Sequence, residues 1–416
     1  MSSERQPSES VDAERLWQRH MLLANCGARN DGGVCRLALS PEEAEARALL
    51  VEWARAIGLK AYSDAAANLF LRLDGRDQGA APVLCGSHID SQPNGGKFDG
   101  AYGVLAGLEA VTALLSSGRT PRRSIEIVAW MNEEGSRFSP GMAGSEAYTG
   151  AKPLDVLLDV HDDAGVSVRE AVAQIHAGDC DIPLRDLGRP VHAFIEAHIE
   201  QADLLQRAEK VIGIVTGIQG TRRYRVTVAG EAAHAGTALR RDRKDALMAA
   251  ARMVSSIDAL AQQPDDLKLT VGLFNVFPNA PPVVPEKVFF SIDIRHSDTS
   301  VVDRMDGVVR AVIAREKGPC EAVIEQIAMA PSLDFSDDLR AVLSRIAADL
   351  DLPQMDVYSA AGHDARQLHY FCPTAMVFIP CRDGISHNPN EWAEPAHAAA
   401  GARLLADALW HLAERT

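Results

Sequence analysis

The chain contains 416 residues, of which 47% are hydrophobic and 24% charged, and it carries a formal net charge of −15. This length exceeds one compact core, so two domains are expected, and the acidity argues against the basic face that nucleic acid requires. No run reaches the roughly 18 apolar residues of a membrane span, and no secretory signal is visible. Seven cysteines without regular spacing favour a reducing compartment. We therefore expect a cytoplasmic protein with no nucleic-acid or membrane partner.

The first eighty residues predict a Ser/Glu-rich disordered tail over 1–10, followed by helices and short strands. Helices are expected over 11–25 and from Ser40 to Ile57, and strands over 59–64 and 68–75. The second helix has the clearest start signal, because Ser40 can cap it and proline and acidic residues follow.

The stretch 86–110 carries the first candidate metal ligands. An apolar run leads into His88 and Asp90, a Gly-rich loop returns Asp99, and a helix is expected from Gly100. A histidine nitrogen and a carboxylate at the mouth of a sheet suit a hydrolytic metal site. Asp90 could accept the second ring proton of His88 and fix its tautomer. The alternative is a polar turn after a core strand.

The strand expected over 124–130 ends in two adjacent carboxylates, Glu133 and Glu134. Adjacent side chains on an extended segment face opposite ways, so the pair cannot share one task unless the chain bends at Gly135. One metal ligand and one general base is the useful division. The alternative is a solvated acidic loop.

Residues 151–190 are expected to be helical and surface-like, with exposed histidines at 161 and 176. The strand that follows contains His198, the candidate ligand of this region, with Glu200 and His192 as fallbacks.

An α+β unit is predicted as an insert at 213–328, which divides the larger domain into 1–212 and 329–416. The insert combines strands near 221–230, 267–277, 288–296 and 321–329 with helices over 244–260 and 299–316. After it, a helix over 336–351, a strand over 374–381 and a final helix complete the fold.

Five candidate ligands stand out along the chain: His88, Asp99, Glu134, His198 and His387. Most follow or lie in β-like runs, and ligands gather at the carboxyl ends of strands in open α/β sheets. Three histidines and two carboxylates suit two divalent ions that share one carboxylate, with zinc, manganese, cobalt or nickel favoured. Cys85 and Cys381 lie next to these strands and are expected to be buried apolar residues rather than nucleophiles.

Eight ordered motifs resemble the metal-dependent amidohydrolases of the M20 peptidase clan, and more closely their hydantoinase/carbamoylase branch. They are GSHIDSQPNGGKFDGAYGVLAGLE, WMNEEGSRF, EAHIEQ, GEAAHAGT, PNAPPVVP, DIRH, AAGHDA and GISHNPNEW. The resemblance implies a zinc-peptidase-like α/β catalytic domain, a mixed sheet flanked by helices, with an inserted α+β ferredoxin-like lid that also forms a homodimer.

The resemblance also implies roles for particular residues. His88, Asp99 and His198 would hold one metal, and Asp99, Glu134 and His387 the other. Glu133 would be the general base, Asp90 would orient His88, and His234 would stabilise the oxyanion, in this family within the partner subunit's site. Substrate-binding positions would be Gln201, Asn279, Arg295, Gly362 and His363.

Simpler interpretations remain for three residues of the insert. Arg295 could pair only with Asp293 or Asp298. His234 could be a surface histidine at the end of a strand, and Asn279 could serve the Pro-rich turn.

The implied reaction is cleavage of the ureido C–N bond of a small anionic N-carbamoyl acid, most directly an N-carbamoyl-L-amino acid. Allantoate amidohydrolase, a dipeptidase, an N-acyl amino acid hydrolase and a non-catalytic binding protein are the alternatives. Departures from the usual motifs stand at Ala202, Ala238 to Arg240, Ala360 and Ala361, and Asp383. They leave the ligands and the base intact and leave the substrate open.

Overall fold

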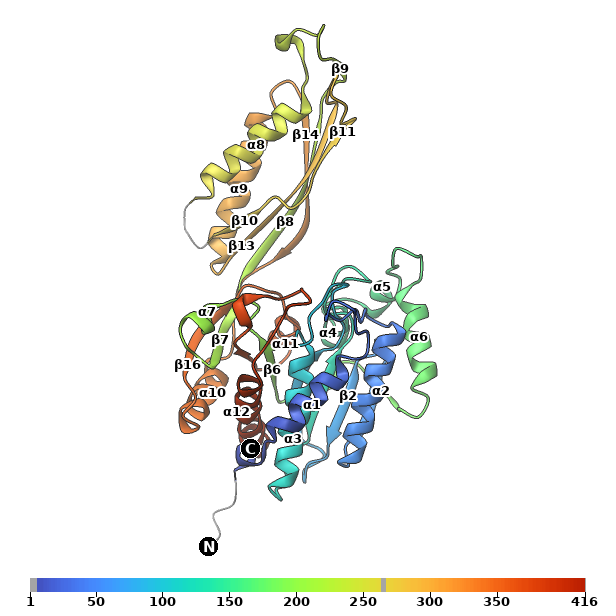
Figure 1. Cartoon of the computed structure of the whole chain (residues 1–416), viewed down its shortest axis with the longest axis vertical. Helices are drawn as coiled ribbons and strands as arrows, with labels where there is room; N and C mark the ends of the chain where they lie inside the picture. Colours follow the sequence, from blue (N-terminus) through green and yellow to red (C-terminus); the bar gives the residue numbers. More distant parts are fainter. Residues whose placement is uncertain (1–5, 263–266, 416) are drawn as a thin grey trace. The chain divides into compact units, whose positions relative to one another are not determined.

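The computed structural model describes residues 6–262 and 267–415 and divides into two compact units (Figure 1). Unit 1 comprises Met1–Thr216 and Phe335–Thr416, and unit 2 comprises Gly217–Asp334. The change in composition at residue 213 falls inside β7 (Ile212–Ile218), which pairs with β17 (Thr374–Ile379) of the large sheet. Unit 2 therefore begins a few residues later than the 213–328 expected from the sequence. Among the described residues, no helix has the length and apolar character to cross a membrane.

Unit 1 is built on a mixed sheet of ten described strands in the order β15-β7-β17-β6-β3-β4-β2-β1-β5, with β16 paired to β7. Four adjacent strands, β17, β6, β3 and β4, run parallel, and the strands beside them, β7 and β2, are antiparallel. The bounds are β1 Lys60–Asp64, β2 Leu69–Leu73, β3 Val83–His88, β4 Ile125–Trp130, β5 Leu184–Arg185, β6 Ala193–Ile199, β15 Leu333–Asp334, β16 Gln354–Ser359 and β17 Thr374–Ile379. The parallel centre aligns four strand ends at one edge.

Helices cover both faces of this sheet (Figure 1). The helical segments of unit 1 are η1 Pro7–Ser10, α1 Ala13–Leu23, α2 Pro41–Ala56, α3 Ala101–Ser116, α4 Ala143–Thr149, α5 Leu154–Leu158, α6 Val168–Gly178, α7 Leu204–Arg207, α10 Asp337–Asp349, α11 Ala365–His369, η3 Arg382–Gly384 and α12 Pro395–Glu414. The predicted cap of α2 is confirmed, because the Ser40 side chain accepts from the backbone N–H of Glu43.

The four parallel strands β3, β4, β6 and β17 are buried along their whole length, as expected of a parallel sheet between helices. In β4, Ile125 and Ile127 join the core formed with α1, α2, α3, α10 and α12. Trp130 faces the other way and packs edge-on against Tyr148 of α4. A second apolar cluster joins α4, α5 and α6.

In its described residues, unit 2 has a five-stranded antiparallel sheet, two α-helices and a separate two-stranded ribbon. Its elements are β8 Gly220–Ala229, β9 Ala233–His234, η2 Arg240–Asp242, α8 Ala246–Leu260, β10 Lys268–Thr270, β11 Phe274–Phe277, β12 Val283–Val284, β13 Lys287–His296, α9 Thr299–Glu316 and β14 Glu321–Ala330. The strand order is β10-β13-β8-β14, and β11 also pairs with β13. Helices α8 and α9 share the apolar core of this sheet.

Three expectations about local structure were wrong. Residues 7–10, placed in a disordered tail, form η1, where the backbone N–H of Ser8 donates to Asp407 at 2.9 Å; residues 1–5 lie outside the described range. The single strand over 267–277 is interrupted, because the hydroxyl of Ser291 accepts the N–H of Leu273 between β10 and β11. His176 is half-buried, with Nε2 3.0 Å from the carbonyl oxygen of Asp64.

Candidate active site

The predicted site residues of unit 1 converge at the carboxyl ends of the four parallel strands. His88 ends β3, Glu133 and Glu134 follow β4, and His198 is the next-to-last residue of β6. His387 lies in the loop after β17. Adjacent parallel strands end at the same edge of a sheet, so backbone topology alone brings these distant positions together.

Asp99 lies at the centre of this group, and each of its carboxylate oxygens faces a different set of side chains. Oδ1 is 3.5 Å from Nε2 of His88 and 3.2 Å from Nε2 of His198. Oδ2 is 3.2 Å from Nε2 of His387, whose Nε2 is also 3.4 Å from Oε2 of Glu134. The Asp99 carboxylate is common to the two sets.

The chemistry of these donors fits two divalent cations. In the first set, His88, Asp99 and His198 bring their ligand atoms within 4.8 Å of one another, and Asp99, Glu134 and His387 do so in the second. Imidazole nitrogen with carboxylate oxygen suits zinc, manganese, cobalt and nickel and includes no thiolate. A carboxylate with one oxygen in each set has the arrangement needed to bridge two ions.

Gly100 makes room for the first set. Its φ is +64°, and a Cβ there would lie 2.4 Å from the ring of His88. Only glycine meets both demands, the left-handed backbone and the close approach. The backbone nitrogen of Gly100 also lies 3.1 Å from Nε2 of His198.

Asp90 lies against His88 and also contacts the two glutamates. Nδ1 of His88 lies 3.0 Å from the backbone carbonyl oxygen of Asp90 and 3.5 Å from its carboxylate. The carboxylate also accepts the backbone N–H groups of Glu133 and Glu134, each at 3.2 Å. Asp90 can therefore orient the histidine, and its carboxylate also fixes the turn that separates the two glutamates.

Glu133 and Glu134 diverge, as the alternation argument requires. Glu134 Oε2 faces His387, while Glu133 Oε2 lies 3.6 Å from Nε2 of His88. The Glu133 side chain is only 11% exposed. One carboxylate therefore belongs to the second ligand set and the other lies beside the first.

The titratable groups of the site are strongly perturbed, which is typical of catalytic centres. Burial raises the pKa of Glu133 well above its ordinary value, aided by the charges of Asp364 and Glu134 against the opposing charge of His88. Burial and the Asp99 charge raise the pKa of Glu134 to about 7. A raised pKa makes the Glu133 carboxylate a stronger base than an exposed glutamate, which suits a group that accepts and returns a proton.

The histidines hold the central carboxylate ionised. Burial would raise the pKa of Asp99, but hydrogen bonds from His198, His387 and His88 place it well below its usual value. The hydrogen bond to Asp99 raises the pKa of His387 to about 9 against partial burial.

Gln201 and His363 lie against the ligands, at different depths. Gln201 Nε2 donates to Asp99 Oδ2 at 2.7 Å, while its Oε1 is buried without a hydrogen-bond partner among the described residues. His363 is buried; its Nε2 is 3.0 Å from the hydroxyl of Ser359, and its ring packs edge-on against His198 at 4.6 Å. Gly362 lies beside it, and a Cβ at this position would be in van der Waals contact with the Met142 side chain at 3.7 Å.

The three predicted site residues of unit 2 lie on exposed or half-buried parts of that unit. His234 ends β9, and its Nδ1 accepts the backbone N–H of Gly236 at 3.1 Å. Asn279 is exposed with φ of +57°, as a turn residue would be. Arg295 donates from Nε and Nη2 to Asp293, each at 3.0 Å, so the pairing considered as an alternative is present.

Glu200, the fallback ligand, and the two cysteines next to the site strands have structural rather than catalytic surroundings. Glu200 accepts the backbone N–H groups of Leu204 and Leu205 at the start of α7. Cys85 and Cys381 are buried, and burial raises the pKa of both thiols, to about 12 for Cys381. A thiol held protonated is a poor nucleophile.

Three polar residues that the sequence analysis missed support the ligands. Gln92 donates to Oε2 of Glu134 at 2.7 Å, and Ser386 lies 2.8 Å from Oδ2 of Asp99. Glu391 accepts the backbone N–H of Asp99. Each lies within five residues of a predicted site residue in one of the motifs, and that proximity was the available signal.

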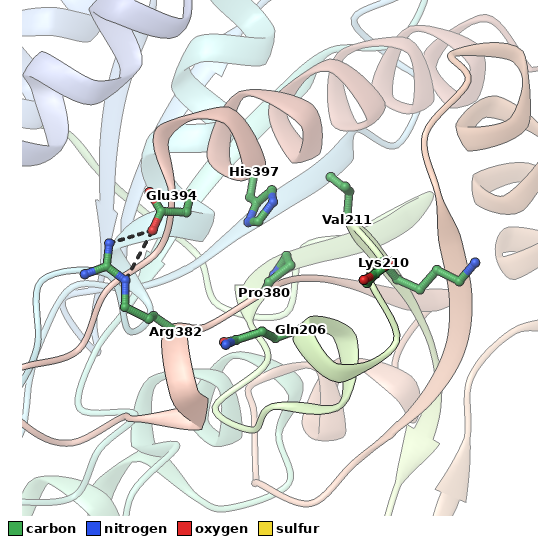
Figure 2. A pocket seen from close by; sticks show the side chains of 8 residues that line it. Gln206, Lys210, Val211, Pro380, Arg382, Glu394 and His397 are labelled. Carbon is green, nitrogen blue, oxygen red and sulfur yellow. Dashed lines mark hydrogen bonds and ion pairs between the residues drawn. The ribbon is translucent and has the colours of Figure 1, made fainter.

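A separate cavity of about 480 Å³ lies beside η3 and contains none of the predicted site residues (Figure 2). Its wall includes Gln206, Lys210 and His397, with an ion pair of 2.5 Å between Arg382 and Glu394. The ligand sets therefore do not belong to this cavity.

Comparison with known proteins decides the family. The profile of Peptidase family M20/M25/M40 matches residues 84–411, which include all five candidate ligands. The chain belongs to this family. The M20 family is hydrolytic and metal-dependent, so the chain is a hydrolase, and its described residues include candidate metal-binding clusters.

Individual relatives extend the M20 similarity over nearly the whole chain. The chain is 39% identical to an N-carbamoyl-L-amino acid amidohydrolase of Geobacillus stearothermophilus, covering 97% of this chain and 99% of that protein. It is 36% identical to an allantoate amidohydrolase of Bacillus subtilis, covering 94% and 95%. A crystal structure of a hydantoinase/carbamoylase family amidase from Burkholderia multivorans superposes with a TM-score of 0.89, at 41% identity and 98% and 99% coverage.

Proposed function

We propose that this chain is a dinuclear metal-dependent amidohydrolase that cleaves the ureido C–N bond of N-carbamoyl-L-amino acids. The observation that carries the proposal is the Asp99 carboxylate, which directs one oxygen to His88 and His198 and the other to His387. Similarity to an amidohydrolase named for N-carbamoyl-L-amino acids supports the substrate class.

In this proposal His88, Asp99 and His198 hold one cation, and Asp99, Glu134 and His387 hold the other. Two divalent cations, zinc, manganese, cobalt or nickel, supply Lewis acidity and lower the pKa of water when bound. Glu133 takes a proton from the attacking water and delivers it to the leaving nitrogen, for which its raised pKa is suited. The C–N bond breaks to the free amino acid and carbamate, which decays to ammonia and carbon dioxide.

We propose substrate contacts for five residues and an oxyanion contact for His234. Gln201 is proposed to use its unpartnered Oε1, together with Gly362 and His363, to line the site in unit 1. Asn279 and Arg295 are proposed to bind the substrate carboxylate. His234 is proposed to donate from Nε2 to the oxyanion, because its Nδ1 already accepts a backbone N–H.

We propose that unit 2 is a ferredoxin-like lid through which two copies of the chain form a homodimer. The main elements follow in the order β8, α8, β10 with β11, β13, α9 and β14, and this βαββαβ order supports the ferredoxin-like fold. All seven cysteines are free, which supports residence in the cytoplasm.

Ammonia release from a panel of ureido acids tests the proposal. The panel contains N-carbamoyl-L-amino acids, their D-enantiomers, β-ureidopropionate and allantoate, each assayed with added manganese. We expect turnover of the N-carbamoyl-L-amino acids that is lost on chelation. Bound metal without turnover of any of these compounds would contradict the ureido assignment.

Allantoate is the second candidate substrate, supported by the similarity to the allantoate amidohydrolase of Bacillus subtilis. The two candidates are separated by kcat/KM, since one pocket will discriminate between a ureido group on an amino acid and two ureido groups on one carbon. A higher kcat/KM for allantoate would transfer the assignment.

A further inference from the structure

Glu391 is a buried carboxylate between two ligand-bearing segments, and its side chain is already committed to three donors. It is 2% exposed and lies in the loop that leads into α12. Its Oε1 accepts the backbone N–H groups of Phe98 at 2.8 Å and Asp99 at 3.1 Å. Its Oε2 lies 3.0 Å from the hydroxyl of Ser386.

Ser386 extends this contact to the central carboxylate. Its hydroxyl is 2.8 Å from Oδ2 of Asp99, and it directly precedes His387 in the chain. A hydroxyl has one proton, so it can donate to Asp99 or to Glu391 at any moment. Glu391 is thus connected to Asp99 twice, through the backbone N–H and through Ser386.

The surroundings of Glu391 are shaped for its carboxyl group. A Cβ at Gly96 would lie 2.1 Å from the carboxyl carbon of Glu391, so only glycine leaves space for it. The next residue, Trp392, packs edge-on against Phe98 at 5.7 Å and against Trp17 at 5.2 Å. These contacts hold the loop against the segment that carries Asp99.

The two ligand sets differ in how firmly the backbone fixes them. His88 and His198 lie on central strands and are 1% exposed. The His387 side chain is 47% exposed and lies on a loop. A ligand on a loop depends more on supporting hydrogen bonds for its position than a ligand on a buried strand does.

We propose that Glu391 is the positioning residue that holds Asp99 and the His387 loop in register for the second cation. This inference rests on the proposed function, because it assumes that cations bind there. Glu391 touches neither substrate nor metal in this account and acts only through Asp99 and Ser386.

The test measures the affinity of the full-length protein for a divalent cation by competition with a chromogenic chelator. A separate dissociation constant is obtained for each of the two bound ions. In Glu391→Ala, both connections are lost, and we expect the ion of the Asp99, Glu134 and His387 set to bind about 10- to 100-fold less tightly. In Glu391→Gln, the amide oxygen can accept the two backbone N–H groups and the amide nitrogen can donate to Ser386, so we expect most of the affinity to return.

Two further variants separate positioning from general damage. Ser386→Ala removes only the hydroxyl connection and should weaken the ion on the His387 side while the other ion is unchanged. The matched control is Glu394→Ala, three residues away, whose carboxylate pairs with Arg382 at the separate cavity (Figure 2). The control should bind both ions as the wild type does.

The outcomes distinguish this inference from the proposed function. Wild-type affinity for both ions in folded Glu391→Ala, or an equal loss in Glu394→Ala, would overturn the positioning role. If Glu391→Ala does not fold, unchanged affinity in Ser386→Ala would overturn it. A wild-type protein that binds no divalent ion would instead contradict the proposed function.

Discussion

At the scale of single residues, the site depends on which atom of a side chain faces which partner. Asp99 supplies one oxygen to each ligand set, and Asp90 uses its carbonyl for His88 and its carboxylate for the two glutamates. A carboxylate with both oxygens engaged is fixed in rotation, so it can present a constant separation between two cations. Substitution of Asp99 should therefore be more harmful than substitution of a residue that belongs to one ligand set.

Replacing Glu133 by glutamine should remove the base and leave the metal site. The variant keeps the shape of a buried side chain but cannot take up a proton. We expect kcat to fall by about 100- to 10,000-fold, with metal content unchanged by elemental analysis. Glu394→Gln serves as the control at a carboxylate outside the site. Undiminished turnover in Glu133→Gln would show that another group is the base.

His20 should make the protein sensitive to acid. Burial, together with the charge of Arg36, lowers the pKa of His20 to about 3, and neither ring nitrogen has a hydrogen-bond partner among the described residues. The unfolded chain takes up this proton near the ordinary pKa of about 6.5. The contribution to stability is thus complete above that pH and is lost progressively as the pH falls toward 3.

The corresponding experiment compares urea unfolding at pH 7 and pH 5. Because the unfolded chain binds this proton and the folded chain does not, the free energy of unfolding of wild type should fall by about 2 kcal/mol more than that of His20→Phe over that interval. His161→Phe, at an exposed histidine, should behave as wild type does. Equal losses in wild type and His20→Phe would contradict the assignment.

At the scale of elements, the sequence predicted the site better than it predicted the connections around it. The parallel strand ends that carry His88, Glu134 and His198 are evident from apolar runs that stop at polar residues, and the Ser40 cap follows a local rule. These features depend on neighbours in the sequence. The convergence of Glu391, Ser386 and Asp99 depends on tertiary packing between segments almost 300 residues apart, which no local pattern encodes.

Backbone paths explain the remaining differences. The turn after β3 brings the carbonyl of Asp90 closer to His88 than its carboxylate. The residue types alone do not specify the path of this turn. The break between β10 and β11 depends on a side-chain hydrogen bond from the neighbouring strand. The family resemblance was confirmed by the profile match, and the individual roles of the site residues stay predictions.

The loop after β9 illustrates how one side chain can support an element. Arg243 donates from Nη2 to the carbonyl oxygens of Ala235 at 2.6 Å and Ala238 at 2.9 Å, and so fixes the loop that follows His234. We expect Arg243→Ala to lower kcat by about 10- to 100-fold through misplacement of His234, with metal content unchanged. Arg304→Ala, on α9, is the control.

A double-mutant cycle decides whether Arg243 acts through His234. If it does, adding Arg243→Ala to His234→Ala should cost little further activity. Losses that multiply in the double variant would show that Arg243 supports the fold of unit 2 independently of His234.

At the scale of the whole molecule, the proposed homodimer is expected to have twice the mass of the 44.8 kDa chain. Edge strand β14 exposes Val323 at 67% and Met329 at 58%, and an unpaired strand edge with apolar side chains favours association. In analytical ultracentrifugation, wild type should sediment as a dimer. Val323→Lys places a charge on this edge and should sediment as a monomer. A fully active monomer at working concentrations would contradict the dimer.

The most direct measurement of the central claim is anomalous diffraction from crystals grown with manganese or zinc. The account predicts two peaks, one among His88, Asp99 and His198 and one among Asp99, Glu134 and His387. Density for an ion elsewhere, or ordered side chains at both sets with no anomalous peak between them, would contradict it.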